Sequence, residues 1–119
     1  MPIAITAEQP NTCRLEIRGQ FSQQDLAAAQ QAAAAEIRRS GKIRLLVVLA
    51  DFNGWDRGSA WDDLGFYIRH GDDIERIAIV GETRWRSEAL MFAAADLRRA
   101  PVAFFGGSDL QAARDWLAR

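Results

Sequence analysis

The fold is decided by the stretch Ile43-Arg44-Leu45-Leu46-Val47-Val48-Leu49-Ala50, which is apolar at every position except Arg44. Two shorter runs of the same kind follow at 77–80 and 102–105. Strands without polar alternation are usually covered on both faces, as in parallel sheets whose strands are joined by crossover helices. The three runs therefore predict the central strands of a parallel sheet.

The residues before this stretch predict two further strands. Apolar residues alternate with smaller ones over 3–6 and with charged ones over 13–18. Such alternation is typical of half-buried strands, and the turn-forming residues at 8–11 join the two as a hairpin. The sheet is therefore expected to carry one antiparallel edge strand.

Helical patterns separate the strands and follow the last one. They are expected at about 22–41, 59–70, 83–99 and from 108 onwards. Ser22, Ser59 and Ser108 are suitable N-caps, and Gln111 stands at capping-box spacing from Ser108. The order β-β-α-β-α-β-α-β-α predicts an α/β fold with a mostly parallel five-stranded sheet.

Composition limits the class of protein. The 119 residues fit a single domain spanning 1–119, and 49% hydrophobic with 26% charged residues is ordinary for a globular chain. The net charge of -1 provides no excess that would draw the molecule to nucleic acid. Cys13 is the single cysteine, no secretory signal is recognised, and no apolar run approaches the ~20 residues of a membrane span. A cytoplasmic location is expected.

Several motifs combine in an unusual way along nearly the whole chain. The long apolar run leads into Asp51-Phe52-Asn53-Gly54-Trp55-Asp56, and Trp61-Asp62-Asp63-Leu64 follows. Next comes Asp73-Ile74-Glu75-Arg76-Ile77-Ala78-Ile79-Val80-Gly81, with a lone Trp85 and a closing Asp115-Trp116-Leu117. In this combination the sequence resembles the SpoIIAA-like family, the STAS and Sec14-like group of small bacterial proteins.

The resemblance implies a fold similar to anti-sigma-factor antagonists and to Sec14-type lipid-transfer domains. It also implies contact with a small apolar ligand or a membrane surface, as suggested for family members. Antagonists of the sigma-regulatory type carry Asp-Ser-Ser-Gly after the third strand, and one serine is a phosphorylation switch. Here the matching stretch reads Asp56-Arg57-Gly58-Ser59. This departure puts the switch in doubt, and Ser59 is interpreted as a helix cap.

The segment 51–58 is a first candidate binding site. We expect a loop at the carboxyl end of a strand, where ligands of open α/β sheets bind. Trp55 offers a broad apolar surface with one hydrogen-bond donor, and Asp56 lies beside it. The alternative is a structured connection whose tryptophan covers the core. The acidic residues of this region do not have the spacing of an EF-hand, so no metal site is predicted.

The helix expected at 83–99 is the second candidate. Residues 89–95 are apolar around the whole helix, although one apolar face would satisfy a sheet. Arg84 and Arg86 oppose the helix dipole at its N-terminus, and a broken local rule of this kind points to function. The arginines suit an anionic head group, and the apolar surface suits an acyl chain or a bilayer. The alternative pairs Arg84 with Glu88 and buries the surplus in a dimer.

The sequence therefore predicts a non-enzymatic binding or regulatory module without a cofactor. It contacts a small apolar or amphiphilic, lipid-like ligand or a membrane surface, and it does not bind nucleic acid. The alternative is a protein–protein interaction module in bacterial signalling, without the phosphorylatable serine and as a monomer or homodimer. His70 is the one histidine, and no nucleophile motif precedes a helix, so no catalytic residue is predicted. The predicted ligand-binding residues are Trp55, Asp56, Phe66, Arg84, Trp85, Arg86, Leu90 and Met91.

Overall fold

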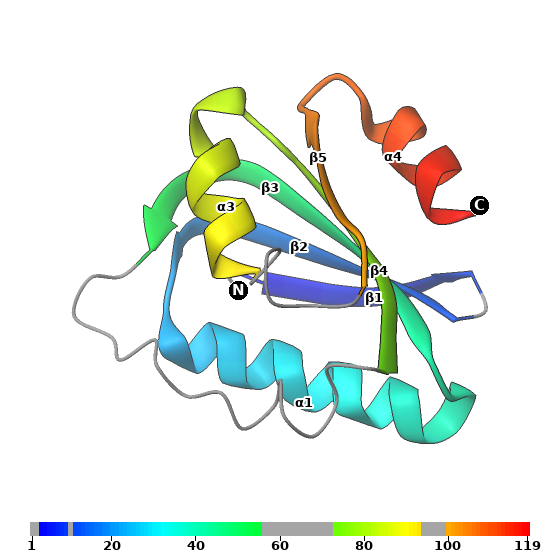
Figure 1. Cartoon of the computed structure of the whole chain (residues 1–119). Helices are drawn as coiled ribbons and strands as arrows, with labels where there is room; N and C mark the ends of the chain where they lie inside the picture. Colours follow the sequence, from blue (N-terminus) through cyan, green and yellow to red (C-terminus); the bar gives the residue numbers. More distant parts are fainter. Residues whose placement is uncertain (1–2, 10, 56–72, 94–99) are drawn as a thin grey trace.

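The computed structural model of the chain describes residues 3–9, 11–55, 73–93 and 100–119 (Figure 1). Within these ranges the strands form one sheet in the order β1-β2-β3-β4-β5. β1 pairs antiparallel with β2, and every other neighbouring pair is parallel. The predicted fold class, a mostly parallel five-stranded sheet with one antiparallel edge, is confirmed. The strands are β1 Ile3–Gln9, β2 Thr12–Phe21, β3 Ile43–Trp55, β4 Ile74–Gly81 and β5 Val102–Gly106.

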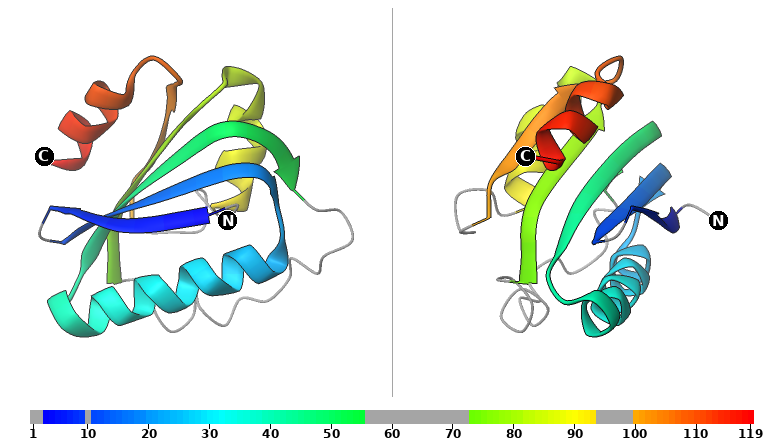
Figure 2. Two further views of the ribbon diagram at one scale, coloured as in Figure 1. Left: turned by 180° about the vertical axis from the view of Figure 1, so that it is seen from behind. Right: turned by 90° about the vertical axis from the view of Figure 1, so that its right-hand side faces the viewer.

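Helices cover both faces of the sheet (Figures 1 and 2). α1 and α3 lie on one face, and α4 lies on the other, over β3, β4 and β5. None of the described helices combines the length and the apolar character needed to cross a membrane. The helices are α1 Gln23–Ser40, the short 3-10 helix η2 Thr83–Trp85, α3 Arg86–Phe92 and α4 Leu110–Leu117.

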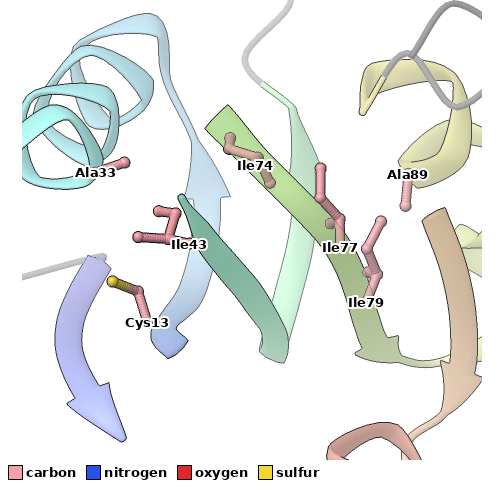
Figure 3. Packing of buried hydrophobic residues seen from close by; sticks show 7 residues of the cluster. All are labelled: Cys13, Ala33, Ile43, Ile74, Ile77, Ile79 and Ala89. Atoms are coloured by element: carbon pink, nitrogen blue, oxygen red, sulfur yellow. The ribbon is translucent and has the colours of Figure 1, made fainter. Parts of the chain in front are cut away.

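The face under α1 and α3 carries the larger part of the core. Figure 3 shows Ala33 of α1 directed towards Ile43, and Ala89 of α3 directed towards Ile77 and Ile79. Small alanine side chains at these contacts let each helix lie close to the strands. The alanine-rich face of α1 therefore packs against the sheet, and Ala29 and Ala33 are its buried residues.

On the opposite face, the buried residues of the described chain lie under α4. Ala113 and Leu117 of α4 pack against Leu46 of β3 and against Ala78 and Val80 of β4. Successive residues of a strand point to opposite faces, so one strand feeds both parts of the core. This two-sided burial is the reason why β3 and β4 are almost continuously apolar.

Two of the three predicted serine caps lie within the described residues, and they turn out differently. The Ser22 hydroxyl accepts from the Asp25 backbone N–H at 3.2 Å, and the Asp25 carboxylate accepts from the Ser22 N–H at 3.1 Å, which confirms a capping box. The capping box expected at Ser108 is wrong. α4 has Asp109 as its N-cap and no side-chain capping bond, because the turn after β5 continues through Ser108. Gln111 then stands one position too early for the box, and its amide donates to Asp115 instead.

The segment 51–55 is strand and not loop, which corrects the sequence interpretation. β3 continues to Trp55 because two irregularities in its pairing with β2 absorb the turn-forming residues. Asp51 and Gly54 adopt positive φ angles of 49° and 102° at these irregularities. Bulges of this kind re-aim side chains without ending a strand. The rest of the predicted loop and the helix expected at 59–70, with Asp56, Phe66 and His70, lie outside the described residues.

Candidate functional site

Three aromatic rings meet at the carboxyl end of the sheet, and we call them the aromatic cluster. Phe52 and Trp55 come from the end of β3, and Trp85 comes from η2, which follows β4. The ring centroid of Phe52 lies 4.9 Å from that of Trp55 and 5.1 Å from that of Trp85. The two tryptophan centroids are 5.9 Å apart. β3 and β4 are neighbours in the sheet, so residues thirty positions apart in the chain form one cluster.

The cluster is a packed wall and not an open cage. Interplanar angles of 75–83° at these separations describe direct edge-to-face contact. Gly54 makes room for this packing, because a Cβ atom there would lie 3.3 Å from Cη2 of Trp85. The cluster also continues into the core around Phe21 and Ala29. Trp55 therefore covers the core, as expected from the alternative interpretation of segment 51–58, and it is still partly exposed.

Trp85 carries a polar group that has no partner among the described residues. Its indole nitrogen Nε1 is buried and makes no hydrogen bond within the structure as described. Leaving a buried donor unpaired costs about 1–3 kcal/mol. The Trp85 ring therefore packs against Phe52 and Trp55, while its N–H group forgoes a hydrogen bond to the described residues.

The Arg84 side chain lies on the outer surface of the cluster. Its guanidinium carbon is 4.8 Å from the centroid of the Trp85 ring, a cation–π contact. Its Nε atom is 3.3 Å from a carboxylate oxygen of Glu82, and both side chains are well exposed. The alternative interpretation paired Arg84 with Glu88, and the structure pairs it with Glu82 instead. Residues 83–85 form a 3-10 turn, so the i,i+4 spacing of an α-helix does not apply there.

The outer side of η2 and α3 continues from the cluster, and we call it the α3 surface, formed by Arg84, Arg86 and Met91. All three residues are exposed, and Met91 reaches 76%, the one large apolar side chain that is exposed within the described ranges. Ala89 faces the sheet and is buried, while Leu90 is half-buried. α3 thus has a buried face at Ala89, a half-buried side at Leu90 and an exposed side at Met91. The residues expected to extend it, 94–99, lie outside the described residues.

The structure brings most of the predicted binding residues together. Trp55, Trp85 and Arg84 are in contact, and Arg86 and Met91 follow directly on α3. Asp56 and Phe66 lie outside the described residues. Sequence reasoning missed Phe52, which is buried in the cluster, because it was placed in a loop. An apolar residue two positions after Ala50 is consistent with a strand that continues. The bulge at Asp51 interrupts the regular alternation of the strand, so the sequence pattern did not indicate this continuation.

Acidic side chains near the site are not arranged to hold a metal ion. Among the described residues, no group of three or more histidine, cysteine or carboxylate side chains could hold one. The Asp51 side chain is almost fully exposed, and its carboxylate lies 3.4 Å from the Arg18 guanidinium. Asp51 therefore stabilises the edge of the bulge through a surface pair, which is worth little by itself.

Cys13 lies in the core under α1 and is expected to be unreactive. Burial raises the pKa of the Cys13 thiol above its ordinary value of 9.0, and the Glu36 carboxylate adds to the rise, while Arg39 opposes it. Thiolate is the reactive form, so the folded protein should resist Ellman's reagent at pH 8 and react rapidly in urea. Equal rates in both states would contradict this assignment.

The same pKa shift makes a prediction about stability. The folded state keeps its proton above pH 9.0, where the unfolded chain loses it, so the free energy of unfolding should fall as pH rises beyond 9.0. Cys13→Ala should lose this part of the pH dependence while keeping the rest. Urea denaturation from pH 8 to 10.5 measures the difference between the two proteins.

Comparisons with known proteins agree on one family and one fold. A family model described as SpoIIAA-like matches residues 12–118. A crystal structure of an uncharacterised protein with a SpoIIAA-like fold from Shewanella loihica PV-4 is 24% identical, with a TM-score of 0.72. The match covers 97% of this chain and 91% of that one. The comparison with curated proteins gives no match.

Two further solved structures are similar in fold at low identity. One is the anti-sigma factor antagonist SpoIIAA in its unphosphorylated form, 8% identical, with a TM-score of 0.63, covering 96% of this chain and 97% of that one. The other is the Bacillus cell fate determinant SpoIIAA in its phosphorylated form, 8% identical, with a TM-score of 0.62 and coverages of 96% and 98%. At these identities the likeness shows the fold alone.

Proposed function

Because this chain belongs to the SpoIIAA-like family, we propose that it is a protein-interaction module of bacterial signalling that acts without catalysis. The match over 12–118 is the observation that carries the proposal. The fold is shared with SpoIIAA, whose description as an anti-sigma factor antagonist names an action on another protein. This support favours the protein-interaction interpretation of the sequence over the lipid interpretation.

We assign the contact with the partner to the α3 surface. Met91 is a large flexible apolar side chain held in solvent, and methionine adapts well to a partner's surface. Arg84 and Arg86 flank it, and arginine is enriched at the centres of interfaces. Trp85 and Trp55 form the rigid base beside these side chains. The combination suits a protein partner with an apolar side chain next to acidic ones.

Photo-crosslinking and binding measurements test this assignment. A photoreactive amino acid is placed at position 91 and, as a control, at the exposed position 112 of α4. The partner is the protein that crosslinks from position 91 and not from position 112. With the purified partner, Met91→Asp is expected to weaken binding at least about tenfold, because a carboxylate would be buried in an apolar contact. Ala112→Asp introduces the same charge on another helix and should leave the affinity unchanged.

Two outcomes would contradict the proposal. Equal affinities for Met91→Asp and the unchanged protein would remove the α3 surface from the contact. The lipid interpretation would be favoured instead if the protein sediments with anionic vesicles, Met91→Asp abolishes this sedimentation, and no protein crosslinks selectively from position 91.

A further inference from the structure

β1 forms one edge of the sheet. Its one neighbour among the described strands is β2, and the right-hand view of Figure 2 shows it as the outermost strand, away from α3 and α4. One side of an edge strand presents N–H and C=O groups that a further strand can bond. The β1 edge is therefore a different place on the molecule from the α3 surface.

The sequence of β1 lacks the features that usually protect an edge strand. Natural edges carry lysine, proline or bulges that prevent pairing with another chain. Residues 3–7 read Ile-Ala-Ile-Thr-Ala, without a charge or a proline, and they pair with β2 in an unbroken register. The irregularity of β1 comes only after Ala7. Five consecutive residues can therefore accept another strand.

These five residues are complementary to a second copy of themselves. In an antiparallel pair centred on Ile5, each Ile5 lies opposite the other, Ile3 lies opposite Ala7, and Ala4 lies opposite Thr6. Opposite residues of an antiparallel pair point to the same face of the sheet. Ile3 and Ile5 are half-buried against the core under α1. The apolar face under α1 would therefore continue from one copy to the other.

The other face of the same pair brings opposite charges into line. Within one chain, Glu16 of β2 lies opposite Ala4, and Arg14 lies opposite Thr6. Pairing about Ile5 joins these rows, so that Glu16 of one copy faces Arg14 of the other across two short side chains. Their backbones are then about 14 Å apart, or three strand spacings, which two long charged side chains can largely bridge. The two-fold symmetry produces this row twice.

The charges also select the register. In a pair centred on Ala4, the rows would align Glu16 of one copy with Glu16 of the other, and a pair centred on Thr6 would align Arg14 with Arg14. Like charges in such rows oppose the pairing. A slip of one residue would turn the isoleucines of one copy towards the charged face of the other. Among these registers, only the pair centred on Ile5 is complementary on both faces.

We propose that two copies of this chain associate through β1, antiparallel about Ile5, so that their sheets become continuous. The partner strand bonds the open backbone edge, the two Ile5 side chains cover each other, and the rows of Glu16 and Arg14 fix the register. This contact is isologous, as is usual for symmetric dimers. α3 packs against β5 at the far edge of the sheet, so the α3 surface remains free in both copies.

Sedimentation equilibrium with a charge swap tests the interface. The unchanged protein is expected to dimerise, and Arg14→Glu and Glu16→Arg should each weaken dimerisation about tenfold, because both rows then carry like charges. The double variant restores opposite charges in both rows and should recover most of the affinity. Glu75→Arg makes the same substitution at an exposed position of β4 and should leave dimerisation unchanged. A monomeric unchanged protein, or a double variant as weak as the single ones, would overturn the proposal.

Disulfide crosslinking locates the contact without relying on charge. Cysteines at directly opposite positions of an antiparallel pair are close enough to bond, so oxidised Ile5→Cys should run as a covalent dimer on a non-reducing gel. Ile3→Cys is the control, because the two copies of residue 3 would lie about 14 Å apart along the strands. The native Cys13 is buried in both variants. Equal crosslinking from positions 3 and 5, or none from position 5, would contradict pairing about Ile5.

Discussion

Phe52→Ala is expected to lower the free energy of unfolding by about 4 kcal/mol, because a fully buried aromatic ring is lost and a cavity remains. Only 2% of Phe52 is exposed, and both tryptophans of the aromatic cluster rest their rings against it. A loss of this size is a large share of the 5–15 kcal/mol that is typical of whole domains. Urea denaturation measures the loss, and near-UV circular dichroism should show weakened signals from the tryptophans.

Phe105→Ala is the matched control on the other face of the sheet. Phe105 is half-buried, and its ring centroid lies 6.0 Å from that of Trp116. Since less area returns to water, a loss of about 1–2 kcal/mol is expected. Similar losses for the two variants would mean that Phe52 does not support the cluster as its burial indicates.

The architecture of the sheet could be predicted because burial on two faces leaves a signature along the chain. A strand covered by helices on both sides carries few polar residues, so 43–50 stands out as apolar apart from Arg44, and 77–80 is apolar throughout. The hairpin of β1 and β2 has one face exposed to solvent, and the alternation of apolar and polar residues along it identifies its strands equally well. These signals depend only on the residues of each strand.

The end of β3 could not be predicted, because its residues favour a turn individually. Asp51, Asn53 and Gly54 are typical of loops, and the structure uses two of them at positive φ inside the strand. What keeps them in the sheet is the continued pairing with Gly19 and Gln20 of β2. A neighbouring strand decided this outcome, and a single segment carries no information about its neighbour.

The candidate site could be located from the sequence but not described by it. Counting apolar positions around the third predicted helix indicates an excess, yet it does not tell which of Ala89, Leu90 and Met91 is bare. In the structure Ala89 is buried, Leu90 is half-buried and Met91 is exposed. The Trp85 N–H has no partner among the described residues because of how η2 places the indole ring, and no residue pattern specifies this placement.

Gly54→Ala is expected to cost about 2–4 kcal/mol of unfolding free energy, from two separate causes. The φ angle of 102° is one that side chains rarely adopt, and the new methyl group would also press on Trp85 at 3.3 Å. Gly19→Ala is the matched control in the same irregular part of the sheet. Its φ angle is also positive, at 65°, but nothing lies within 4 Å of the added atom, so about 1–2 kcal/mol is expected.

Repeating Gly54→Ala in a Trp85→Ala background separates the two causes. Removing the indole ring takes away the contact but leaves the backbone strain, so the cost of Gly54→Ala should fall towards that of Gly19→Ala. The difference between the two backgrounds is the coupling energy between position 54 and Trp85, measured as in any double-mutant cycle. A coupling near zero would mean that Trp85 moves aside freely, and the aromatic cluster would then be a soft surface and not the rigid base that the α3 surface requires.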